Sequence, residues 1–471
     1  MNNQVKELME TVVSNDYCVG CGICAALDNS PLTMVLDENG QYKPVYNPQE
    51  QIDKMEVDVL KVCPFSNDSK DESELGEELY GAIPSIKHNE YEGYFVNNYA
   101  AYVKSGDYRS KGSSGGMGNW IASKLLETNM VDGVIHVKDR EDKENSDILF
   151  EYKVSFNRSE LEQGAKSKYY PIELSNILNM VKDSDKKYAI IGVPCFLKSV
   201  RLLASEDARI KERIKFYVGL VCGHLKSDMF AKSMGWQMGI NPEHLETIDF
   251  RKKLENKAAN NYGVQATGYV DDKLETKISA TKDLYTTNWG QGFFRYNACE
   301  FCDDVLAETA DVTVGDAWLP KYSNDSQGTN IVIVRNPLLN SLILDNKNEL
   351  FLEELSEEKI YQSQASGLKH RREGLSYRLY LKDREGVWRP KKRVNPSNKI
   401  SKKRKEIYVK RMRISQESFK AFRVAQKSND FNVFREEMKP LINDYEKIAG
   451  TSLLRKTLRK VKRGIYEIKN R

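Results

Sequence analysis

The sequence predicts a multidomain protein of mixed α/β and α+β class, and three observations lead to this prediction. The chain has 471 residues, more than a single hydrophobic core usually organises. Strand and helix patterns alternate through its centre, which is typical of a mixed or parallel sheet with covering helices. The part before this centre groups four cysteines, and the part after it is basic and helical in character.

The composition is that of a globular protein. Hydrophobic residues make up 40% of the chain and aromatic residues 10%, which argues against a disordered or fibrous class. No segment approaches the roughly 20 consecutive apolar residues that cross a bilayer. The segment 1–13 lacks the apolar core of a secretory signal, so we expect a cytoplasmic protein. Thiols stay reduced in that compartment, and eight cysteines therefore indicate metal, cluster or catalytic chemistry rather than disulfides.

Composition divides the chain into three expected segments. We expect a cysteine-containing segment over 1–75, a central domain over 76–369 and a basic helical extension over 370–471. The polar, acidic stretch 67–78 is typical of a linker and sets the first boundary. The net charge of +4 conceals an asymmetry, because 370–471 contains 31 Lys and Arg against 11 Asp and Glu. The remainder carries 41 against 57, so we expect the extension to meet an acidic surface.

The central domain is predicted to contain a βαβ crossover. Two short, dense apolar runs, 187–193 and 215–221, have the pattern of buried strands, and 196–204 between them has that of a helix. This order and spacing favour parallel pairing of the two strands. Further strands are expected at 97–103, 131–137, 311–314 and 331–335, a further helix at 119–127, and a hairpin over 31–44 that turns at 39–40.

The basic extension is expected to be a helical appendage that is either solvated or covers the body of the protein. Its stretch 389–405 contains two prolines and many charges, and we expect a linker there. Beyond Gly450, the segment from Leu453 to Ile468 places apolar side chains on one face of a helix. The alternative is that this last helix docks on a partner or on an anionic membrane surface.

The first four cysteines have the spacing of a ligand set for a 4Fe–4S cluster. Cys18, Cys21 and Cys24 form a C-x2-C-x2-C run, and Cys63 is followed by proline. One loop thus supplies three thiolates and a remote residue the fourth, as in bacterial ferredoxins. Asp28 stands where a further cysteine of that run would be, so we expect one cluster in this ferredoxin-like segment. A zinc knuckle is less favoured, because zinc sites use paired C-x2-C units.

The remaining cysteines, Cys195, Cys222, Cys299 and Cys302, are expected to form a second metal centre. Cys195 and Cys222 follow two predicted strands joined by one helix, at the edge where open α/β sheets bind ligands. Cys299 and Cys302 form a C-x2-C pair that completes a set of four. Spacing alone leaves a 4Fe–4S cluster and a four-thiolate zinc site equally open. The position at the sheet edge and the cluster predicted upstream favour iron–sulfur chemistry.

A turn of small residues precedes the predicted helix 119–127. The segment 111–118 reads KGSSGGMG, and small residues let backbone N–H groups approach an anion at a helix N-terminus. The dinucleotide fingerprint G-x-G-x-x-G does not open a helix there. By itself such a turn is more often an ordinary loop than a phosphate site.

The motifs between residues 16 and 335 follow a recognisable order. They are the C-x2-C-x2-C run, Ser113-Ser-Gly-Gly, Ser167-Lys-Tyr, Gly192-Val-Pro-Cys, Gly219-Leu-Val-Cys, Phe250-Arg-Lys-Lys, Cys299-x2-Cys and Gly315-Asp-Ala-Trp. In this order they resemble the beta subunit family of deazaflavin-coenzyme-reducing hydrogenases and formate dehydrogenases, whose bacterial members often have no known substrate. The resemblance does not reach the basic extension.

This resemblance implies an iron–sulfur flavoprotein. It implies a ferredoxin-like N-terminal part, a central flavin domain that binds FAD, and electron transfer between clusters and flavin. The second cysteine set would hold a cluster beside the flavin, so that the chain would carry two 4Fe–4S clusters. By motif, the FAD site would be lined by Ser113, Ser114, Gly115 and Gly116. Contacts with FAD or with the substrate would come from Lys168, Arg251 and Lys253.

The predicted function is an oxidoreductase that passes electrons between 4Fe–4S clusters and FAD and reduces or oxidises an organic substrate or a deazaflavin-type coenzyme. No catalytic side chain is predicted, because all eight cysteines are assigned as ligands and the five histidines show no metal or triad spacing. Expected partners are a redox protein, such as a ferredoxin or a dehydrogenase subunit, and a small-molecule substrate, but not nucleic acid. The alternatives are an electron-transfer subunit without catalysis of its own and a zinc-stabilised binding protein.

Overall fold

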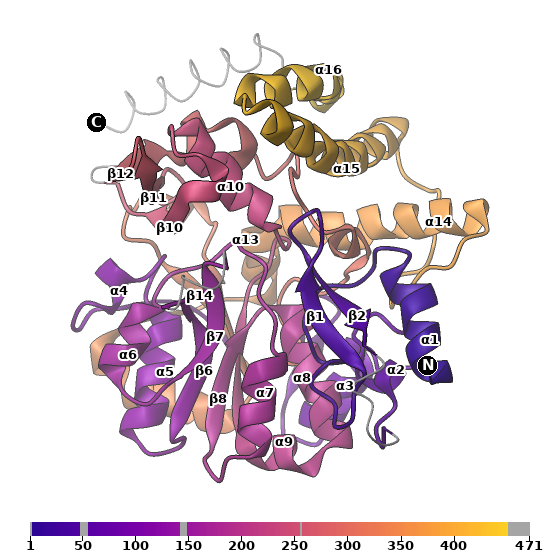
Figure 1. Cartoon of the computed structure of the whole chain (residues 1–471). Helices are drawn as coiled ribbons and strands as arrows, with labels where there is room; N and C mark the ends of the chain where they lie inside the picture. Colours follow the sequence, from indigo (N-terminus) through magenta and orange to yellow (C-terminus); the bar gives the residue numbers. More distant parts are fainter. Residues whose placement is uncertain (1, 48–54, 142–147, 255–256, 451–471) are drawn as a thin grey trace.

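The computed structural model describes residues 2–47, 55–141, 148–254 and 257–450, and its centre is an eight-stranded sheet (Figure 1). The strand order is β15-β5-β14-β13-β9-β8-β6-β7. The four strands β13, β9, β8 and β6 pair in parallel, and the outer strands pair antiparallel. The strands are β5 Asn97–Val103, β6 Gly133–Asp139, β7 Phe150–Ser155, β8 Tyr188–Gly192, β9 Ile214–Leu220, β13 Val312–Asp316, β14 Asn330–Val334 and β15 Leu350–Glu354.

The sheet confirms the predicted α/β class. Each of the predicted strands in the central part begins and ends within two residues of an observed one. β8 and β9 lie side by side in parallel, with Gly192 opposite Gly219, and α8 Pro194–Glu206 and α9 Ala208–Arg213 connect them. The predicted βαβ crossover is therefore present, and it places the ends of both strands at one edge of the sheet.

Side chains alternate between the two faces of the sheet and fill a core on each. On one face Val134 and Ala189 pack with α5 and α12, and their neighbours Ile135 and Ile190 pack with α7 and α8 on the other. The helices of this part, besides α8 and α9, are α4 Tyr108–Lys111, α5 Met117–Glu127, α6 Arg158–Gln163, α7 Ser175–Lys182, α10 Asp228–Gln237, α11 Pro320–Ser323 and α12 Pro337–Asp345.

The N-terminal segment packs against the same core as α7 and α8. Its hairpin turns at the predicted place, between β1 Leu32–Leu36 and β2 Tyr42–Tyr46. The linker predicted over 67–78 is wrong, because a helix, α3, begins within it. Asp71 caps that helix by accepting the backbone N–H of Glu74, whose carboxylate accepts from Asp71 in return. The other elements are α1 Asn3–Leu8, η1 Met9–Val13, α2 Val59–Val62, α3 Glu72–Tyr80, β3 Lys87–Asn89 and β4 Gly93–Phe95.

A three-stranded antiparallel sheet beside α10 was not predicted. Its last strand, β12, is largely exposed along its length, so its sequence lacks the buried alternating face that identifies a strand. The strands are β10 Leu245–Lys252, β11 Gly263–Val270 and β12 Lys273–Ala280, and short 3-10 turns occur at η3 Pro242–His244, η4 Thr281–Asp283, η5 Tyr285–Thr287, η6 Asn297–Phe301 and η7 Lys347–Glu349.

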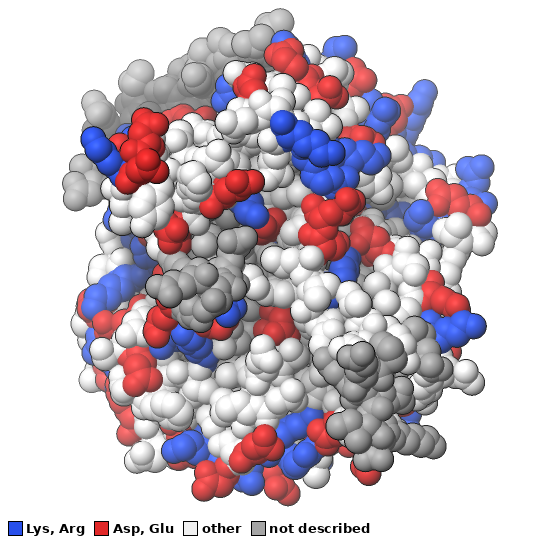
Figure 2. All heavy atoms as spheres, viewed as in Figure 1, with Lys and Arg blue, Asp and Glu red and all other residues white. Residues whose placement is uncertain are grey.

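The basic extension is helical in its described part and packs on the body. Phe422 and Phe434 lie against Phe294, with ring centroids 5.3 and 5.6 Å away. Figure 2 shows Lys and Arg side chains gathered over the position of α15. The amphipathic helix predicted from Leu453 to Ile468 lies outside the described residues. The helices are α13 Glu357–Lys369, η8 His370–Gly374, α14 Leu375–Glu385, α15 Lys402–Ser428 and α16 Phe431–Ala449.

None of the helices in the described ranges is long and apolar enough to span a bilayer.

The stretch between α14 and α15 is not the linker that the sequence predicted over 389–405. It contains no helix before residue 402, but it lies against the protein and is not a solvated linker. Trp388 packs on Tyr17 with ring centroids 5.5 Å apart, and the backbone N–H of Lys391 donates to the Asn67 side chain at 2.6 Å. The side chain of Arg393 is only 11% exposed. The charged side chain of Arg393 is buried because it pairs with buried carboxylates. Composition alone does not reveal such a pairing.

Buried His136 in β6 predicts a pH dependence of stability. Its side chain is 4% exposed, and its Nε2 lies 2.8 Å from the Ser155 hydroxyl. Burial, with a smaller effect of the Lys138 charge, lowers its pKa from 6.5 to about 4. Between these pH values the unfolded chain binds the additional proton, so the free energy of unfolding rises with pH through this window. We expect His136 to account for about 3 kcal/mol of that rise.

Urea unfolding at several pH values from about 4 to 7 measures this contribution. The variant His136→Gln should show a shallower increase in the free energy of unfolding than the native protein. Equal slopes in the two proteins would contradict the assignment to His136.

Candidate functional site

The first cysteine set surrounds a cavity between the N-terminal loop and α2. The loop that follows η1 supplies three thiols, and the fourth comes from the residue at which α2 ends. Gly20 and Gly22 have φ of +71° and +80°, which side-chain-bearing residues rarely adopt, and they allow the loop to turn its cysteines to one side. The four cysteines that line the cavity are Cys18, Cys21, Cys24 and Cys63.

Burial keeps these thiols protonated in the absence of a metal. It is the largest cause that raises the pKa of Cys21 to about 12 and that of Cys63 to about 11. Metal ligation requires thiolates, so binding at this cavity releases protons. Lys43 supplies a positive charge nearby, because its Nζ lies 3.3 Å from the carbonyl oxygen of Cys18 and 2.7 Å from the Asp16 carboxylate.

Asp28, which stands in place of a further cysteine, forms ion pairs. Its carboxylate lies 2.9 Å from Nζ of Lys182 and also accepts from Arg209. Partial burial raises its pKa, but the hydrogen bonds from these two cations outweigh burial and the pKa lies below its ordinary value. Asp28 therefore joins the N-terminal segment to α7 and α9.

The second cysteine set surrounds another cavity, at the carboxyl edge of the parallel strands. Cys195 is the second residue of α8, directly after β8, and Cys222 lies two residues beyond β9. Cys299 belongs to η6 and Cys302 ends it. The structure thus brings together the four residues that the sequence placed in one set, since Cys195, Cys222, Cys299 and Cys302 all line this cavity.

Nearby donors and charges act on this second set. The backbone N–H of Leu225 donates to Sγ of Cys299 at 3.2 Å. Burial raises the pKa of Cys302 to about 11, and the positive charges of Arg371 and Lys392 oppose that rise. Arg371 also lines the cavity and donates to the carbonyl of Cys299 at 2.7 Å. Sequence reasoning missed Arg371, because it belongs to a basic run with no motif.

The two cavities are neighbours. Val19 and Phe65 line both of them, and these side chains are 5% and 2% exposed. Val19 directly follows Cys18, and Phe65 lies two residues after Cys63. The two cysteine sets are therefore separated by buried apolar side chains and not by solvent.

Each cysteine set lines a cavity of its own. Within the described ranges, no group of three or more His, Cys, Asp or Glu side chains is placed to hold a single metal ion.

The turn between β5 and α5 is fixed by its neighbours. The Ser113 hydroxyl accepts the backbone N–H of Ser167 at 2.9 Å. The Ser114 hydroxyl donates to a carbonyl just before β14, and the Gly115 carbonyl accepts from the end of β5. Gly116 ends the turn as the N-cap of α5 with φ of +85°.

Two of the predicted cationic contacts lie at this turn. Arg251 donates to the Ser113 carbonyl at 3.2 Å and forms a two-point ion pair with Asp316, at 3.1 and 3.3 Å. Burial disfavours its charge, but Asp316 outweighs burial and raises the pKa of Arg251 well above its ordinary value. Lys253 donates to the Ser114 carbonyl at 3.3 Å, and burial together with nearby cations lowers its pKa to about 8. Both side chains therefore hold the backbone of the turn.

Lys168, the third predicted cationic contact, is not brought to the turn. Its Nζ pairs with Asp139 at 2.7 Å and lies 4.5 Å from the centroid of the Phe150 ring. Its described contacts are those of an ordinary ion pair.

A row of rings connects the second cysteine set to the turn, and sequence reasoning missed it. His224, two residues after Cys222, lies 4.4 Å from the Trp289 ring between centroids. Trp289 lies 5.0 Å from Tyr169, whose hydroxyl is 3.4 Å from the Arg251 guanidinium. These three rings are only partly buried, so the row offers an aromatic surface for a planar ligand. Its members come from three separate segments, which no local pattern links.

Two family models match adjacent parts of the chain. The model for the coenzyme F420 hydrogenase/dehydrogenase beta subunit, N-terminal part, matches residues 98–179, and the model for its C terminus matches 185–359. The chain belongs to this beta subunit family. The resemblance predicted from the motif order is thereby confirmed. The matched region contains the turn and the second cysteine set, whereas the first set and the extension beyond 359 lie outside it.

Two relatives from Methanocaldococcus jannaschii illustrate the similarity. A coenzyme F420-dependent sulfite reductase is 24% identical over 342 residues, which are 69% of this chain but 45% of the reductase. The chain thus spans less than half of that relative. An uncharacterized protein is 22% identical over 355 residues, covering 70% of this chain and 87% of the relative. Among solved structures, a chain of the F420-reducing NiFe hydrogenase complex from Methanosarcina barkeri matches 60% of this chain and 92% of its own length, with 14% identity and a TM-score of 0.44.

Proposed function

We propose that this chain is an iron–sulfur flavoprotein oxidoreductase that passes electrons between two 4Fe–4S clusters and FAD. The observation that carries the proposal is the partition of the eight cysteines into two four-cysteine cavities that share Val19 and Phe65. Redox centres in these two cavities would be neighbours, separated by buried apolar side chains. Membership of an oxidoreductase family supports the same chemistry.

The arrangement of the cysteines favours clusters over zinc. Structural zinc sites typically use paired C-x2-C units. In the first set three cysteines come from one loop and the fourth from a remote residue, which is the division of ligands that ferredoxins use for a cuboidal cluster. The second set lines a cavity at the carboxyl edge of the sheet and shares two lining residues with the first. The residues present therefore fit two 4Fe–4S groups.

The proposed place for FAD is between the turn 112–116 and the aromatic row. The turn offers small residues at the start of α5, and Trp289 and Tyr169 offer partly buried rings. His224 joins this surface to the second cysteine set. A bound flavin would supply the exchange between single electrons and hydride. Lys168 pairs with Asp139 and remains a proposed contact for FAD or substrate, and Trp289 is added to the proposed contacts.

The chain itself would position the cofactor and exclude water. Asp316 orients Arg251, which in turn holds the Ser113 carbonyl, so the shape of the turn does not depend on a ligand. Lys253 holds the next carbonyl in the same way. Arg371 and the Leu225 N–H place positive charge and a donor at the second cysteine set, where burial would otherwise disfavour thiolates.

The substrate is proposed to be a deazaflavin-type coenzyme or another small organic hydride acceptor or donor. The F420-dependent relative supports the first choice. A ferredoxin or a dehydrogenase subunit is proposed as the redox partner, facing the ferredoxin-like segment 1–75.

Anaerobic purification of the full chain tests the proposal, with iron, acid-labile sulfide, zinc and flavin measured per chain. We expect about eight iron and eight sulfide, the content of two 4Fe–4S clusters, and one FAD. A chain that contains the clusters but no flavin would be an electron carrier only. A colourless protein that binds zinc and lacks sulfide would contradict the proposal as a whole.

A further inference from the structure

Basic side chains from residues 371–393 surround the second cysteine set. These residues lie beyond the matched family models, which end at residue 359. Their partners are carbonyls and carboxylates between Gly223 and Glu308, next to Cys299 and Cys302. The basic side chains are Arg371, Arg372, Arg378, Lys392 and Arg393.

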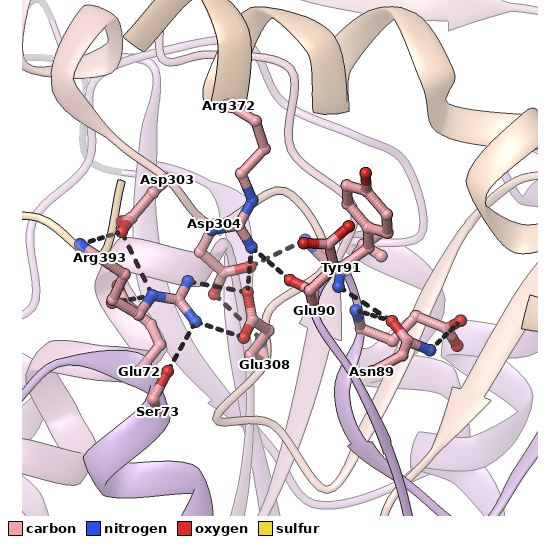
Figure 3. A network of polar contacts seen from close by, with 12 residues as sticks. Glu72, Ser73, Asn89, Glu90, Tyr91, Asp303, Asp304, Glu308, Arg372 and Arg393 are labelled. Carbon is pink, nitrogen blue, oxygen red and sulfur yellow. Dashed lines mark hydrogen bonds and ion pairs between the residues drawn. The ribbon is translucent and has the colours of Figure 1, made fainter. Parts of the chain in front are cut away.

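Most of these cations neutralise buried carboxylates. Figure 3 shows the Arg393 guanidinium between Asp303 and Glu308, with Glu72 on its other side. Its contacts with Glu308 measure 2.6 and 2.9 Å, and that with Asp303 measures 3.2 Å. Arg372 reaches the same Glu308 at 3.5 Å. Asp303 and Glu308 after Cys302 are therefore matched by positive charge.

Arg371 differs from the others because it has no carboxylate partner. Its guanidinium donates to carbonyls only, those of Cys299 at 2.7 Å, Cys302 at 3.5 Å and Gly223. The side chain is 2% exposed and lines the cavity together with the four cysteines. In the described part of the chain, no carboxylate forms an ion pair with it. A buried charge without a counter-charge is costly, so its partner must be an anion in the cavity.

We propose that Arg371 is the counter-charge of the second cluster and raises that cluster's reduction potential. The proposal rests on the proposed function, since it takes the four thiols of this cavity as cluster ligands. Reduction by one electron adds one negative charge inside the cavity, and no proton is needed for balance. The fixed guanidinium stabilises this added charge. Arg371, which lies outside the residues that the family models match, thus sets the reduction potential of a site that lies within them.

The test is an anaerobic redox titration of the full chain with dithionite and mediators, followed by electron paramagnetic resonance. In Arg371→Gln, we expect the equilibrium constant for reduction of the second cluster to fall about tenfold, a decrease of 59 mV for one electron. The first cluster should keep its potential. Arg371→Lys retains the charge and should keep the second potential close to the native value. Lys420→Gln removes one charge from the same extension at a side chain that is 66% exposed, and should shift neither cluster.

Equal second-cluster potentials in native protein and Arg371→Gln would overturn the proposal. If Arg371→Gln does not fold, the Arg371→Lys variant decides the question. A fall of 59 mV or more in the reduction potential of its second cluster would overturn the proposal, because this variant retains the charge. Absence of a second cluster from the native protein would instead be a failure of the proposed function.

Discussion

Replacing Cys222 with alanine should remove about half of the bound iron and acid-labile sulfide. Cys222 is one of four thiols around the second cavity, and alanine offers no ligand atom in its place. Its backbone is held independently of any metal, because its N–H donates to the Val305 carbonyl at 3.0 Å. The fold around it should therefore survive the loss. Iron and sulfide analysis after anaerobic purification gives the result.

Cys63→Ala is the matched variant for the first cavity. It should lose the other half of the iron, and the cluster that remains should give a different paramagnetic signal from the one that remains in Cys222→Ala. The two variants together assign each signal to a cavity. Full iron content in Cys222→Ala would disprove its role as a ligand.

Replacing Gly116 with alanine should weaken FAD binding by tenfold or more, which is about 1.4 kcal/mol. Gly116 has φ of +85°, a conformation that costs an L side chain about 1–2 kcal/mol. A Cβ there would also lie 2.7 Å from the carbonyl of Tyr108, so the backbone of the turn must move. Fluorescence titration of flavin-depleted protein with FAD measures the loss. The iron content should not change, because the cysteines lie outside the turn.

Gly118→Ala is the control, two residues further along in α5. A Cβ at Gly118 would meet only the Val314 side chain, at an ordinary contact distance of 3.5 Å, and α5 should tolerate alanine there. FAD affinity should remain native. If both variants bind FAD as the native protein does, the flavin does not use this turn.

The central sheet could be predicted from the sequence because its strands are locally marked. The runs that became β8 and β9 are apolar throughout, as strands buried on both faces must be, and their boundaries agree with the structure within two residues. In the three-stranded sheet, β12 was missed because none of its residues is buried, so it has no buried face to identify it. The helix α3 was taken for a linker because its acidic residues were read as solvent-exposed charge, although Asp71 and Glu74 form a capping box and Glu72 is buried.

The candidate site, like the fold, could be predicted from the sequence only in part. The cysteine spacings already grouped the eight thiols into two sets, since three cysteines share one loop and two follow neighbouring parallel strands. The contribution of Arg371 could not be predicted, because its contact with the Cys299 carbonyl joins residues 72 apart. The aromatic row from His224 to Trp289 and Tyr169 likewise depends on three segments that meet only after folding.

The sequence by itself determined the ligand spacing, the parallel strand order around Cys195 and Cys222, and the family. These features depend on neighbours along the chain, where periodicity and turn chemistry act over a few residues. Only the tertiary structure decided that Val19 and Phe65 line both cavities, that Lys168 pairs with Asp139, and that the basic extension supplies Arg371. The path of the whole chain decides which charges are buried and which residues two cavities share, because a buried cation needs acceptors or an opposite charge that only folding brings beside it.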